Sequence, residues 1–440
     1  MALPANSTWE IRTATGAPTN GGGWVPGSSG TDYSQQASPQ YSLTNGVANG
    51  TTTIATTSAS SDMVGNIAYV AGGTGSITGA RYQIVSQTTG VSIVVDRSTG
   101  LTAGTGVTIN VGGALASIVT AVAAATQNNL IWCNGSQTIT STMTLSLSYN
   151  GSGGGVNYGC FTFIGYTATR GDGGRFTLTT ATNSVNLITY SGGQYMFQNF
   201  LMSCTAGTPG YGIIAGTSTW YFDLVLVNCR VTGFEENIRS PYSTQIAIVP
   251  LTLINCEIDS AVSHGIETVS QIDIVDSYIH GNGGHGLYMT SASGQVETGF
   301  TIIGSVFYNN TNDGIHHLTA PSSQYSGCKA LIVNSALVSN GGDGYNFASA
   351  SAASINLINV IITQNGTGLS SGSAVTVVGT RFNCAFYGNT TKLSNFPTNS
   401  TDITLTGDPF TSKSTGDFTL NSTAGAGAAC KAAGFQSTLI

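Results

Sequence analysis

Residues 251–289 read LTLINCEIDSAVSHGIETVSQIDIVDSYIHGNGGHGLYM and contain one pattern twice. An alternating apolar stretch ends at Asn255 in the first copy and at Asp276 in the second. Ten residues later each copy reaches a glycine followed by an apolar residue, Gly265-Ile266 and then Gly286-Leu287. A period of two within short apolar stretches indicates β-strands, and its recurrence at a near-constant spacing indicates a repeat protein.

The pattern extends along the chain when the residue that ends each first strand is taken as an anchor. Successive anchors lie 20 to 30 residues apart, at Asn199, Asn228, Asn255, Asp276, Gly304, Asn334, Asn359 and Gly379. Positions two and four before each anchor are apolar, and so is the third position after it, so a second strand begins beyond a corner. The glycine-apolar pair begins a third strand. Three strands per turn, with turns about 4.8 Å apart, predict an all-β parallel β-helix over residues 129–395.

The composition agrees with this fold class and excludes several functions. Only 7% of residues are charged and 59 are glycine, which suits short strands and tight turns better than helices. The net charge of −7, with 12 basic residues, offers no patch for nucleic acid. No apolar run is long enough for membrane insertion, and the N-terminus MALPANSTWE lacks the features of a signal peptide, so we expect synthesis in a host cytoplasm.

The rest of the chain divides into four further segments. Residues 1–48 are expected to form an N-terminal arm that docks to a particle, and residues 49–112 a small β-barrel or sandwich module. Residues 113–128 contain the Ala-rich stretch expected to form a helix that caps the first rung. Residues 396–440 are expected to form a C-terminal cap segment.

The eight cysteines are spread widely and show no CxxC or CxH spacing. They are therefore predicted to be buried free thiols, and the sequence predicts no metal and no cofactor. The stacked anchor side chains are predicted to be structural, forming hydrogen-bond ladders along the axis.

Two stretches carry a resemblance to known proteins. The order of helix, rungs and terminal DPFTSKSTGDFTLNSTAGAGAACKAAGF (408–435) resembles the right-handed parallel β-helix superfamily of pectate lyases and tailspikes, over roughly residues 110–440. TNGGGWVPGSSGTDYSQQ (19–36), with the segment 61–86 behind it, is similar to the front of β-helix proteins from tailed bacteriophages. The resemblance implies a location in the virion, other virion proteins as partners and a homotrimer.

The five histidines fall between residues 264 and 317, in the middle turns. The residue before the turn glycine is His264, then His285, Asp313 and Asp343 in successive turns, and Asp259 is expected to stack over His280. A glycan lying in a groove could find acid, base and hydrogen-bond partners in such a row. The alternative is that these residue types simply suit a turn beside glycine and cap local backbone groups.

The candidate residues form two sets. The catalytic candidates are Glu267, Asp313, Asp259 and His280. The candidates for binding a glycan or a partner are His264, His285, His316, Tyr288 and Tyr325. His316 and His317 are adjacent on a strand and should point to opposite faces, which argues against a shared metal ion.

Insertions of varying length are predicted along one edge of the helix. The segments Thr290–Gly299, Leu318–Cys328 and Ala348–Ser354 would form a ridge that binds a glycan or a neighbouring subunit. No Lys or Arg stands between Asn255 and Lys329, which argues against a lyase of the pectate type in these turns.

The sequence favours a structural virion protein of a tailed bacteriophage over an enzyme. Its role would be that of a capsid decoration, fibre or spike that supports particle stability or host-surface attachment. The alternative is a tailspike-type polysaccharide depolymerase, a glycoside hydrolase or lyase acting on host surface polysaccharide. A bacterial surface adhesin is disfavoured because neither terminus carries an export or anchoring motif.

Overall fold

The computed structural model divides into two compact units, which are described separately. Unit 1 comprises residues 1–138, 147–178 and 193–201, and unit 2 comprises residues 139–146, 179–192 and 202–440. The residues that the structure describes are 8–13, 41–64, 67–75, 77–99, 103–112, 115, 117–124, 128–146, 160–168, 170–191, 193–215, 222–240, 250–269, 271–290, 299–318, 328–348, 353–372 and 377–434. Among them no helix has the length and apolar character needed to cross a membrane.

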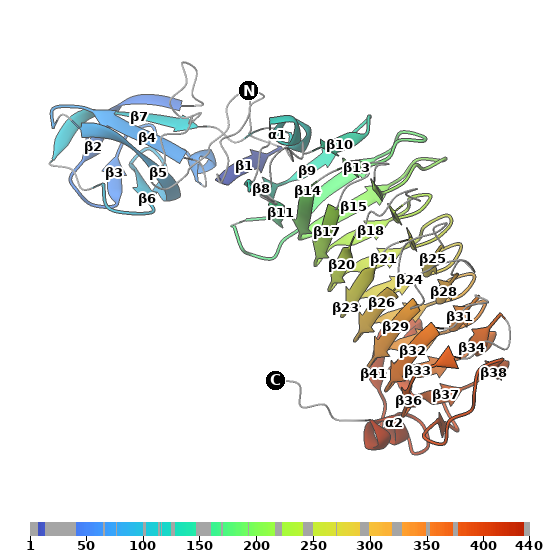
Figure 1. The fold of residues 1–440 in the computed structure, drawn as a ribbon. Helices are drawn as coiled ribbons and strands as arrows, with labels where there is room; N and C mark the ends of the chain where they lie inside the picture. The colour runs from blue at the N-terminus through green and yellow to red at the C-terminus, as the bar shows by residue number, and fades with distance from the viewer. Residues whose placement is uncertain are drawn as a thin grey trace, which may run out of the picture. The chain divides into compact units, whose positions relative to one another are not determined.

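Unit 1 contains a closed antiparallel barrel, coloured blue in Figure 1. Its strands run in the order β2-β3-β6-β5-β4-β7. Their bounds are β2 Tyr41–Ala48, β3 Thr53–Ala55, β4 Ile67–Gly72, β5 Ile77–Thr88, β6 Ser92–Val95 and β7 Gly104–Gly112, with the short helix η2 at Ser61–Met63. Fourteen buried residues, most of them Ile, Val and Ala, fill the interior, so the barrel is a packed core.

The barrel begins earlier than the sequence indicated, within the range assigned to the arm. Strand β2 is interrupted by register shifts between Leu43 and Val47 where it pairs with β7. This irregularity breaks the alternation of apolar and polar residues, so the boundary at residue 49 is corrected to Tyr41.

The remaining described elements of unit 1 form a short parallel stack. They are β1 Thr8–Arg12, β8 Leu130–Asn134, β9 Ser136–Thr138, β11 Cys160–Tyr166, β14 Gly193–Gln198 and the helix α1 Ile118–Ala124. Residues 8–12, also predicted as part of an arm, instead pair in parallel with β8. Trp9 and Ile11 are fully buried, and buried Glu10 is held by Arg170, so apolar burial fixes this strand. Strands β12 Phe176–Thr180 and β15 Phe200–Cys204 straddle the two units.

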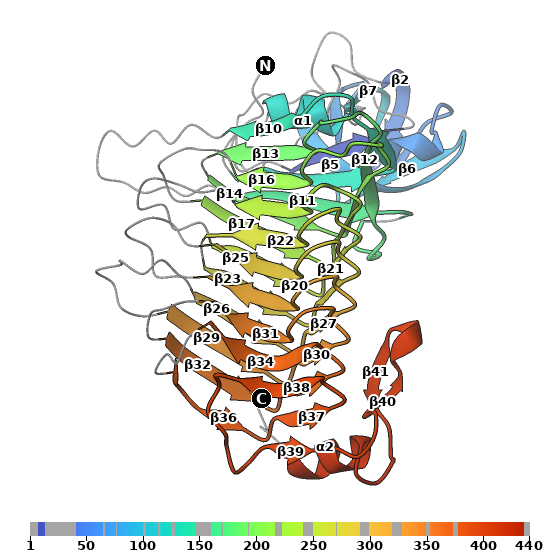
Figure 2. The same cartoon turned by 90° about the vertical axis from the view of Figure 1, so that its right-hand side faces the viewer.

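Unit 2 is a parallel β-solenoid of about seven turns with little helix, which confirms the predicted all-β parallel fold. Figure 2 shows its strands stacked one above another. Sheet A contains β17 Phe222–Val227, β20 Leu251–Ile254, β23 Ile272–Val275, β26 Gly299–Ile303, β29 Cys328–Val333, β32 Ala353–Ile358, β35 Val377–Val378 and β36 Arg381–Phe382. Sheet B contains β18 Arg230–Thr232, β21 Glu257–Asp259, β24 Tyr278–His280, β27 Val306–Tyr308, β30 Ala336–Val338, β33 Ile361–Thr363, β37 Ala385–Tyr387 and β39 Ile403–Thr404.

Sheet C and the turns before its strands carry six of the functional candidates. Its strands are β10 Met143–Ser146, β13 Ile188–Ser191, β16 Ile213–Ala215, β19 Ile238–Ser240, β22 Ile266–Thr268, β25 Leu287–Met289, β28 Ile315–His317, β31 Tyr345–Phe347, β34 Thr367–Ser371 and β38 Thr391–Ser394. In most of these strands the first and third residues are buried and the second is half-buried, so the second residue faces outward.

The anchor column bends the chain between sheets A and B. The anchors of unit 2 from Asn228 to Asn359 all have left-handed backbones, with φ between 49° and 62°, a conformation that Asn, Asp and Gly adopt most easily. In the last turn the left-handed residue is Asn383, with φ 52°, and not Gly379. Leu357 pairs with Arg381, so the true spacing there is four residues longer than predicted.

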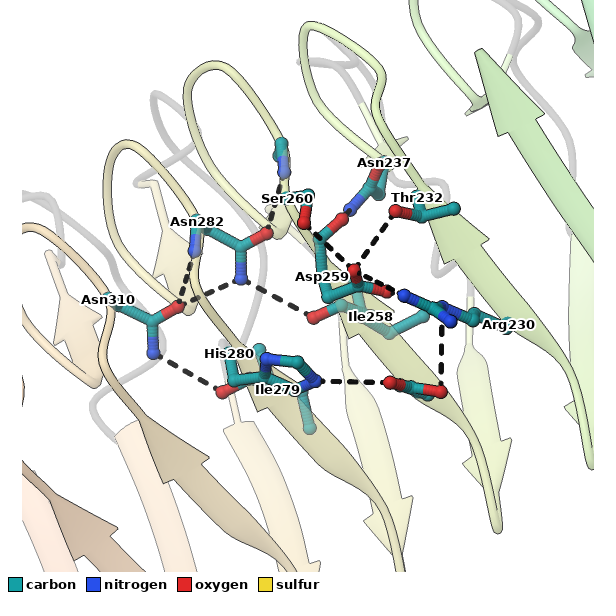
Figure 3. Close-up of polar contacts among 12 residues, drawn as sticks. Arg230, Thr232, Asn237, Ile258, Asp259, Ser260, Ile279, His280, Asn282 and Asn310 are labelled. Atoms are coloured by element: carbon teal, nitrogen blue, oxygen red, sulfur yellow. Dashed lines mark hydrogen bonds and ion pairs between the residues drawn. The ribbon is translucent and has the colours of Figure 1, made fainter. Parts of the chain in front are cut away.

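A second ladder of asparagines lies at the corner between sheets B and C. The side-chain Nδ2 of Asn282 donates to Oδ1 of Asn310 at 2.8 Å, and Asn310 donates to Asn340 at 2.9 Å. Asn340, Asn365 and Asn389 continue the ladder with distances of 3.0 Å. Figure 3 shows the Nδ2 groups of Asn282 and Asn310 also bonding to the carbonyls of Ile258 and Ile279. These buried amides satisfy one another turn by turn, which stabilises the corner.

The cysteines that the structure describes are thiols, and several of them donate hydrogen bonds to backbone carbonyls. Six of them are buried and Cys160 is partly exposed, as expected for thiols that fill small core positions.

The chain ends in a hairpin and a helix. They comprise β40 Phe410–Ser412, the short helix η3 Lys413–Thr415, β41 Asp417–Leu420 and α2 Gly427–Ala433. Phe410 packs on Val306, Ala336 and Val338 of sheet B, and Figure 2 shows β40 and β41 beside the turns that carry these strands.

Candidate functional site

One outward row of side chains runs along sheet C, perpendicular to its strands. The register places Arg239 beside Glu267, Glu267 beside Tyr288, and Tyr288 beside His316. Asn346 and Ser370 continue the row on β31 and β34. Because parallel strands lie about 4.8 Å apart, neighbouring members of this polar row are within contact distance of one another.

A second column stands in the turns that precede these strands. Nδ1 of His264 accepts the backbone N–H of His285 at 3.1 Å, and Nδ1 of His285 accepts that of Asp313 at 3.1 Å. Oδ1 of Asp313 accepts the N–H of Asp343 at 2.7 Å. The turn interpretation therefore holds for these side chains, and the same contacts fix their positions beside the outward row.

A pair of carboxyl groups stands at one end of the row. Glu236, in the turn before β19, is 6% exposed and lies in hydrogen-bond contact with Glu267. Burial, the hydrogen bond and the negative charge of Glu267 together raise the pKa of Glu236 to about 8. Nε of Arg239 is 3.6 Å from Glu236, an ion-pair distance too long for a hydrogen bond. The pair therefore keeps one proton at neutral pH.

Asp313 and His316 form a second polar pair two turns further on. Nδ1 of His316 lies 2.7 Å from Oδ2 of Asp313. Burial alone would raise the pKa of Asp313, but the hydrogen bonds from His316 and from the backbone of Asp343 outweigh it and lower that pKa. Asp313 is therefore charged, and it orients the His316 ring with Nδ1 toward the carboxylate.

Aromatic rings fill the space between the two pairs. The Tyr288 ring lies 4.5 Å from His264, 5.2 Å from His285 and 5.3 Å from His316, measured between centroids. Burial raises the pKa of Tyr288 and lowers the pKa of His285 to about 4. At neutral pH the rings between the two pairs therefore include an uncharged phenol and an uncharged imidazole.

A separate polar cluster lies on sheet B (Figure 3). Arg230 binds Asp259 through two hydrogen bonds of 2.8 and 2.9 Å, and Thr232 and Ser260 also donate to Asp259. Nε2 of His280 is 3.2 Å from Oε1 of Glu257. Asp259 is thus saturated by its own neighbours, which suits an ion-pair network better than a reactive carboxylate.

The structure sorts the predicted residues into two places. Sheet C and its turns bring together Glu267, Asp313, His264, His285, His316 and Tyr288. Asp259 and His280 lie in the sheet B cluster instead. Tyr325 and most of the predicted loop ridge lie outside the described residues. His316 is half-buried while His317 is fully buried, so they face opposite sides as predicted.

The sequence did not identify three residues of the site, namely Glu236, Arg239 and Tyr211. Glu236 and Arg239 flank Asn237-Ile238, which takes the place of the glycine-apolar pair in its turn. Arg239 also donates a hydrogen bond to Tyr211 from the turn before. Glu267 directly follows the pair Gly265-Ile266, and Arg239 directly follows Asn237-Ile238. Aligning these two positions in the sequence would have placed Arg239 beside Glu267.

Two groups of described side chains have the residue types of a metal site. His285, Asp313 and His316 offer ligand atoms within 4.8 Å of one another, as do Glu257, Asp259 and His280. In the first group Nδ1 of His285 already accepts a backbone N–H, and Nδ1 of His316 lies 2.7 Å from Oδ2 of Asp313, so these ligand atoms already take part in hydrogen bonds. In the second group Arg230 takes the place of a cation. Both arrangements are hydrogen-bond networks complete in themselves.

No protein-family model and no curated protein sequence matches the chain. Similar solved structures include the A-module of the Azotobacter vinelandii mannuronan C-5 epimerase AlgE6, with 11% identity, a TM-score of 0.35, and coverage of 63% of this chain and 91% of that one. The Agl-KA catalytic domain has 13% identity, a TM-score of 0.35, and coverage of 92% and 94%. The tailspike protein gp49 from Pseudomonas phage LKA1 has 12% identity, a TM-score of 0.22, and coverage of 84% and 64%.

Proposed function

We propose that this chain binds a polysaccharide along sheet C and hydrolyses it there. The observation that carries the proposal is the order of three consecutive residues in the outward row, Glu267, Tyr288 and His316. They present a proton-holding carboxyl pair, an aromatic surface and an oriented imidazole on three successive strands. This departs from the structural role that the sequence favoured and takes up the depolymerase alternative.

Glu267 and His316, on either side of Tyr288 in the row, have distinct roles. Glu236 holds the proton, which passes through its hydrogen-bond partner Glu267, the more exposed of the two, to the glycosidic oxygen as the bond to the anomeric carbon breaks. Water attacks the opposite face of that carbon and gives its proton to His316, which Asp313 holds in place. Two strand spacings separate the acid from the base, about 10 Å, close to the roughly 6.5–9.5 Å typical of inverting hydrolases. The sugar ring at the cleavage point stacks on Tyr288.

The test is cleavage of a panel of bacterial capsular and O-antigen polysaccharides, measured as new reducing ends. Glu267→Gln and His316→Asn should each lower the rate by about a hundredfold or more. Asp273→Asn, on the outer face of sheet A, is the matched control and should retain activity. The first product should carry the inverted anomeric configuration by NMR. If Glu267→Gln and Asp273→Asn cleave equally well, the row is not the active site.

A second candidate function is the structural virion component that the sequence favoured. It is supported by the turn contacts themselves, since His264, His285 and Asp313 each cap a backbone N–H of the next turn. Absence of cleavage on every polysaccharide tested, with the protein folded, would favour this role.

The location in a tailed-phage virion, attachment to other virion proteins and to the host surface, and the homotrimer are also proposals. An apolar stripe on the outer face of sheet A supports self-association. It consists of register neighbours at the strand ends, namely Val227, Ile254, Val275, Ile303, Val333, Ile358 and Phe382. Ile254, Ile303 and Phe382 are exposed and the other four are half-buried, and an apolar stripe that is partly exposed favours a protein partner.

Light scattering tests the oligomer. The chain should be trimeric, and Ile254→Lys with Ile303→Lys should give monomers with an unchanged circular dichroism spectrum. A wild-type monomer at micromolar concentration would contradict the homotrimer.

We also propose that the β-helix is right-handed with three strands in every turn. The helix within residues 113–128 is proposed to cap its first turn. The three sheets of unit 2 support the first, and the bond from the Ile118 N–H to the Gln137 side chain, next to β9, supports the second.

A further inference from the structure

The C-terminal hairpin and sheet B form the two sides of a cavity that is open to solvent and that the sheet C row does not use. Its volume is about 530 Å³, within the roughly 300–1,000 Å³ typical of small-ligand sites. Sheet B and the corner column form one wall, and the hairpin with α2 forms the other. Because both walls belong to unit 2, the cavity is a feature of one compact body.

The hairpin wall is held in place by aromatic packing. The Phe418 ring lies 4.7 Å from Tyr308 and 5.2 Å from Phe410, and Phe410 is buried against sheet B. Packing of this kind forms the cavity before a ligand arrives, which reduces the ordering cost of binding.

The lining combines aromatic rings with side-chain amides. Tyr278 and Phe418 lie 6.3 Å apart at one part of the wall, and Tyr278 is 41% exposed. The amides of Asn334, Asn359 and Asn383 line the corner on successive turns. This column therefore presents one amide about every 4.8 Å along the axis.

We propose that this cavity binds a short oligosaccharide, as a second saccharide site distinct from the sheet C row. Aromatic faces stack on the C–H faces of sugar rings, and amides donate to and accept from hydroxyl groups. The turn spacing is close to the advance per sugar of an extended polysaccharide, so consecutive sugars can meet consecutive amides.

Other occupants fit the described lining less well. A peptide strand would need an unpaired sheet edge, whereas β24, β27, β30 and β33 are each paired on both sides. Asp417 is the one carboxylate among the lining residues, too few for a metal ion, and its oxygen already accepts from Thr419. Lys431 is the one basic residue there, too few for nucleic acid.

The second site has a consequence for the proposed function, on which this step rests. A polysaccharide held at sheet B stays at high effective concentration near the sheet C row, so loss of the cavity weakens capture of long chains more than cleavage of short ones.

The experiment uses Glu267→Gln/Tyr288→Ala protein, in which hydrolysis is slowed and the stacking surface of the sheet C row is removed, with maltotriose, cellotriose and trigalacturonic acid as probes. Saturation-transfer NMR should detect binding of at least one trisaccharide at millimolar concentration. Tyr278→Ala and Asn334→Gly, each added to this background, should weaken that binding at least tenfold. Gly304 occupies the same column naturally, so glycine at position 334 preserves the turn.

Asn255→Gly is the matched control, because Asn255 belongs to the same column but does not line the cavity. It should bind like the parent. Binding that Tyr278→Ala and Asn334→Gly leave intact, or no binding of any trisaccharide, overturns the second site. Neither result bears on cleavage by wild-type protein, so the two proposals fail separately.

Discussion

Glu236 and Glu267 face each other from consecutive turns of the solenoid, and the more buried of the two, Glu236, has its pKa raised to about 8. Glutamate in an unfolded chain has a pKa near 4.3. Between about pH 4.3 and about pH 8 the folded state therefore holds a proton that the unfolded state has already lost.

Stability should consequently fall as the pH rises from about 5 to about 8 and then level off. Glu236→Gln should remove this loss and make the protein more stable than wild type at pH 8. Thermal unfolding across this pH range measures the effect. Glu257→Gln is the control with the opposite sign, because the hydrogen bond to His280 lowers the pKa of Glu257. A Glu236→Gln variant whose stability follows the wild-type curve would show that this pair holds no proton.

The same titration should limit catalysis. If the carboxyl pair is the general acid, cleavage should decline as the pH rises through about 8, because the proton that it donates is lost. The pH dependence of kcat/KM on a cleaved polysaccharide measures this decline. Replacing Asp273 by Asn should leave the profile unchanged. A rate that stays constant to pH 10 would assign the acid to another group.

The asparagine ladder between sheets B and C should contribute more to the free energy of unfolding than the anchor column between sheets A and B. Asn310 is 1% exposed, and its amide bonds to Asn340, to Asn282 and to the Ile279 carbonyl. Asn310→Ala leaves these buried partners unsatisfied and should cost on the order of 3 kcal/mol of unfolding free energy. Asn334→Gly, at the exposed corner, should cost less than about 1 kcal/mol, since Gly304 fills that column in another turn. Urea unfolding monitored by circular dichroism compares the two, and equal losses would contradict the ranking.

The solenoid was predictable because each buried column recurs in every turn. Ile266, Leu287 and Ile315 occupy equivalent core positions, and their spacing is visible in the sequence. The ladder from Asn282 to Asn389 was not predicted because polar residues in glycine-rich turns normally indicate exposed loops, whereas here they are buried and bond along the axis.

The candidate site was predictable only in part for a related reason. Residues placed in one column by the glycine-apolar pair, such as Glu267, Tyr288 and His316, were found. Glu236 precedes Asn237 as His264 precedes Gly265, but the predicted row began one turn later, at His264. The raised pKa of Glu236 also depends on burial by the fold, which no short motif reports. Asp259 was predicted to stack over His280 on a neighbouring strand, and the two do pair in register, on sheet B.

His317 offers a final test of the solenoid interior. Its ring is fully buried between Met289 and Phe347 in register, and burial lowers its pKa to about 3. An unfolded histidine titrates near 6.5, so stability is complete above that pH and is lost as the pH falls toward 3. His317→Met matches its neighbour in the column and removes the titration. The variant should exceed wild type by on the order of 2 kcal/mol at pH 4, with little difference at pH 7. Unfolding measured at both pH values decides this, with Met289→Leu as the control for repacking. The prediction is wrong if the variant is less stable than wild type at pH 4. In that case the contact between the His317 ring and the Tyr345 hydroxyl, 3.1 Å away, contributes more to stability than removal of the titratable group gains.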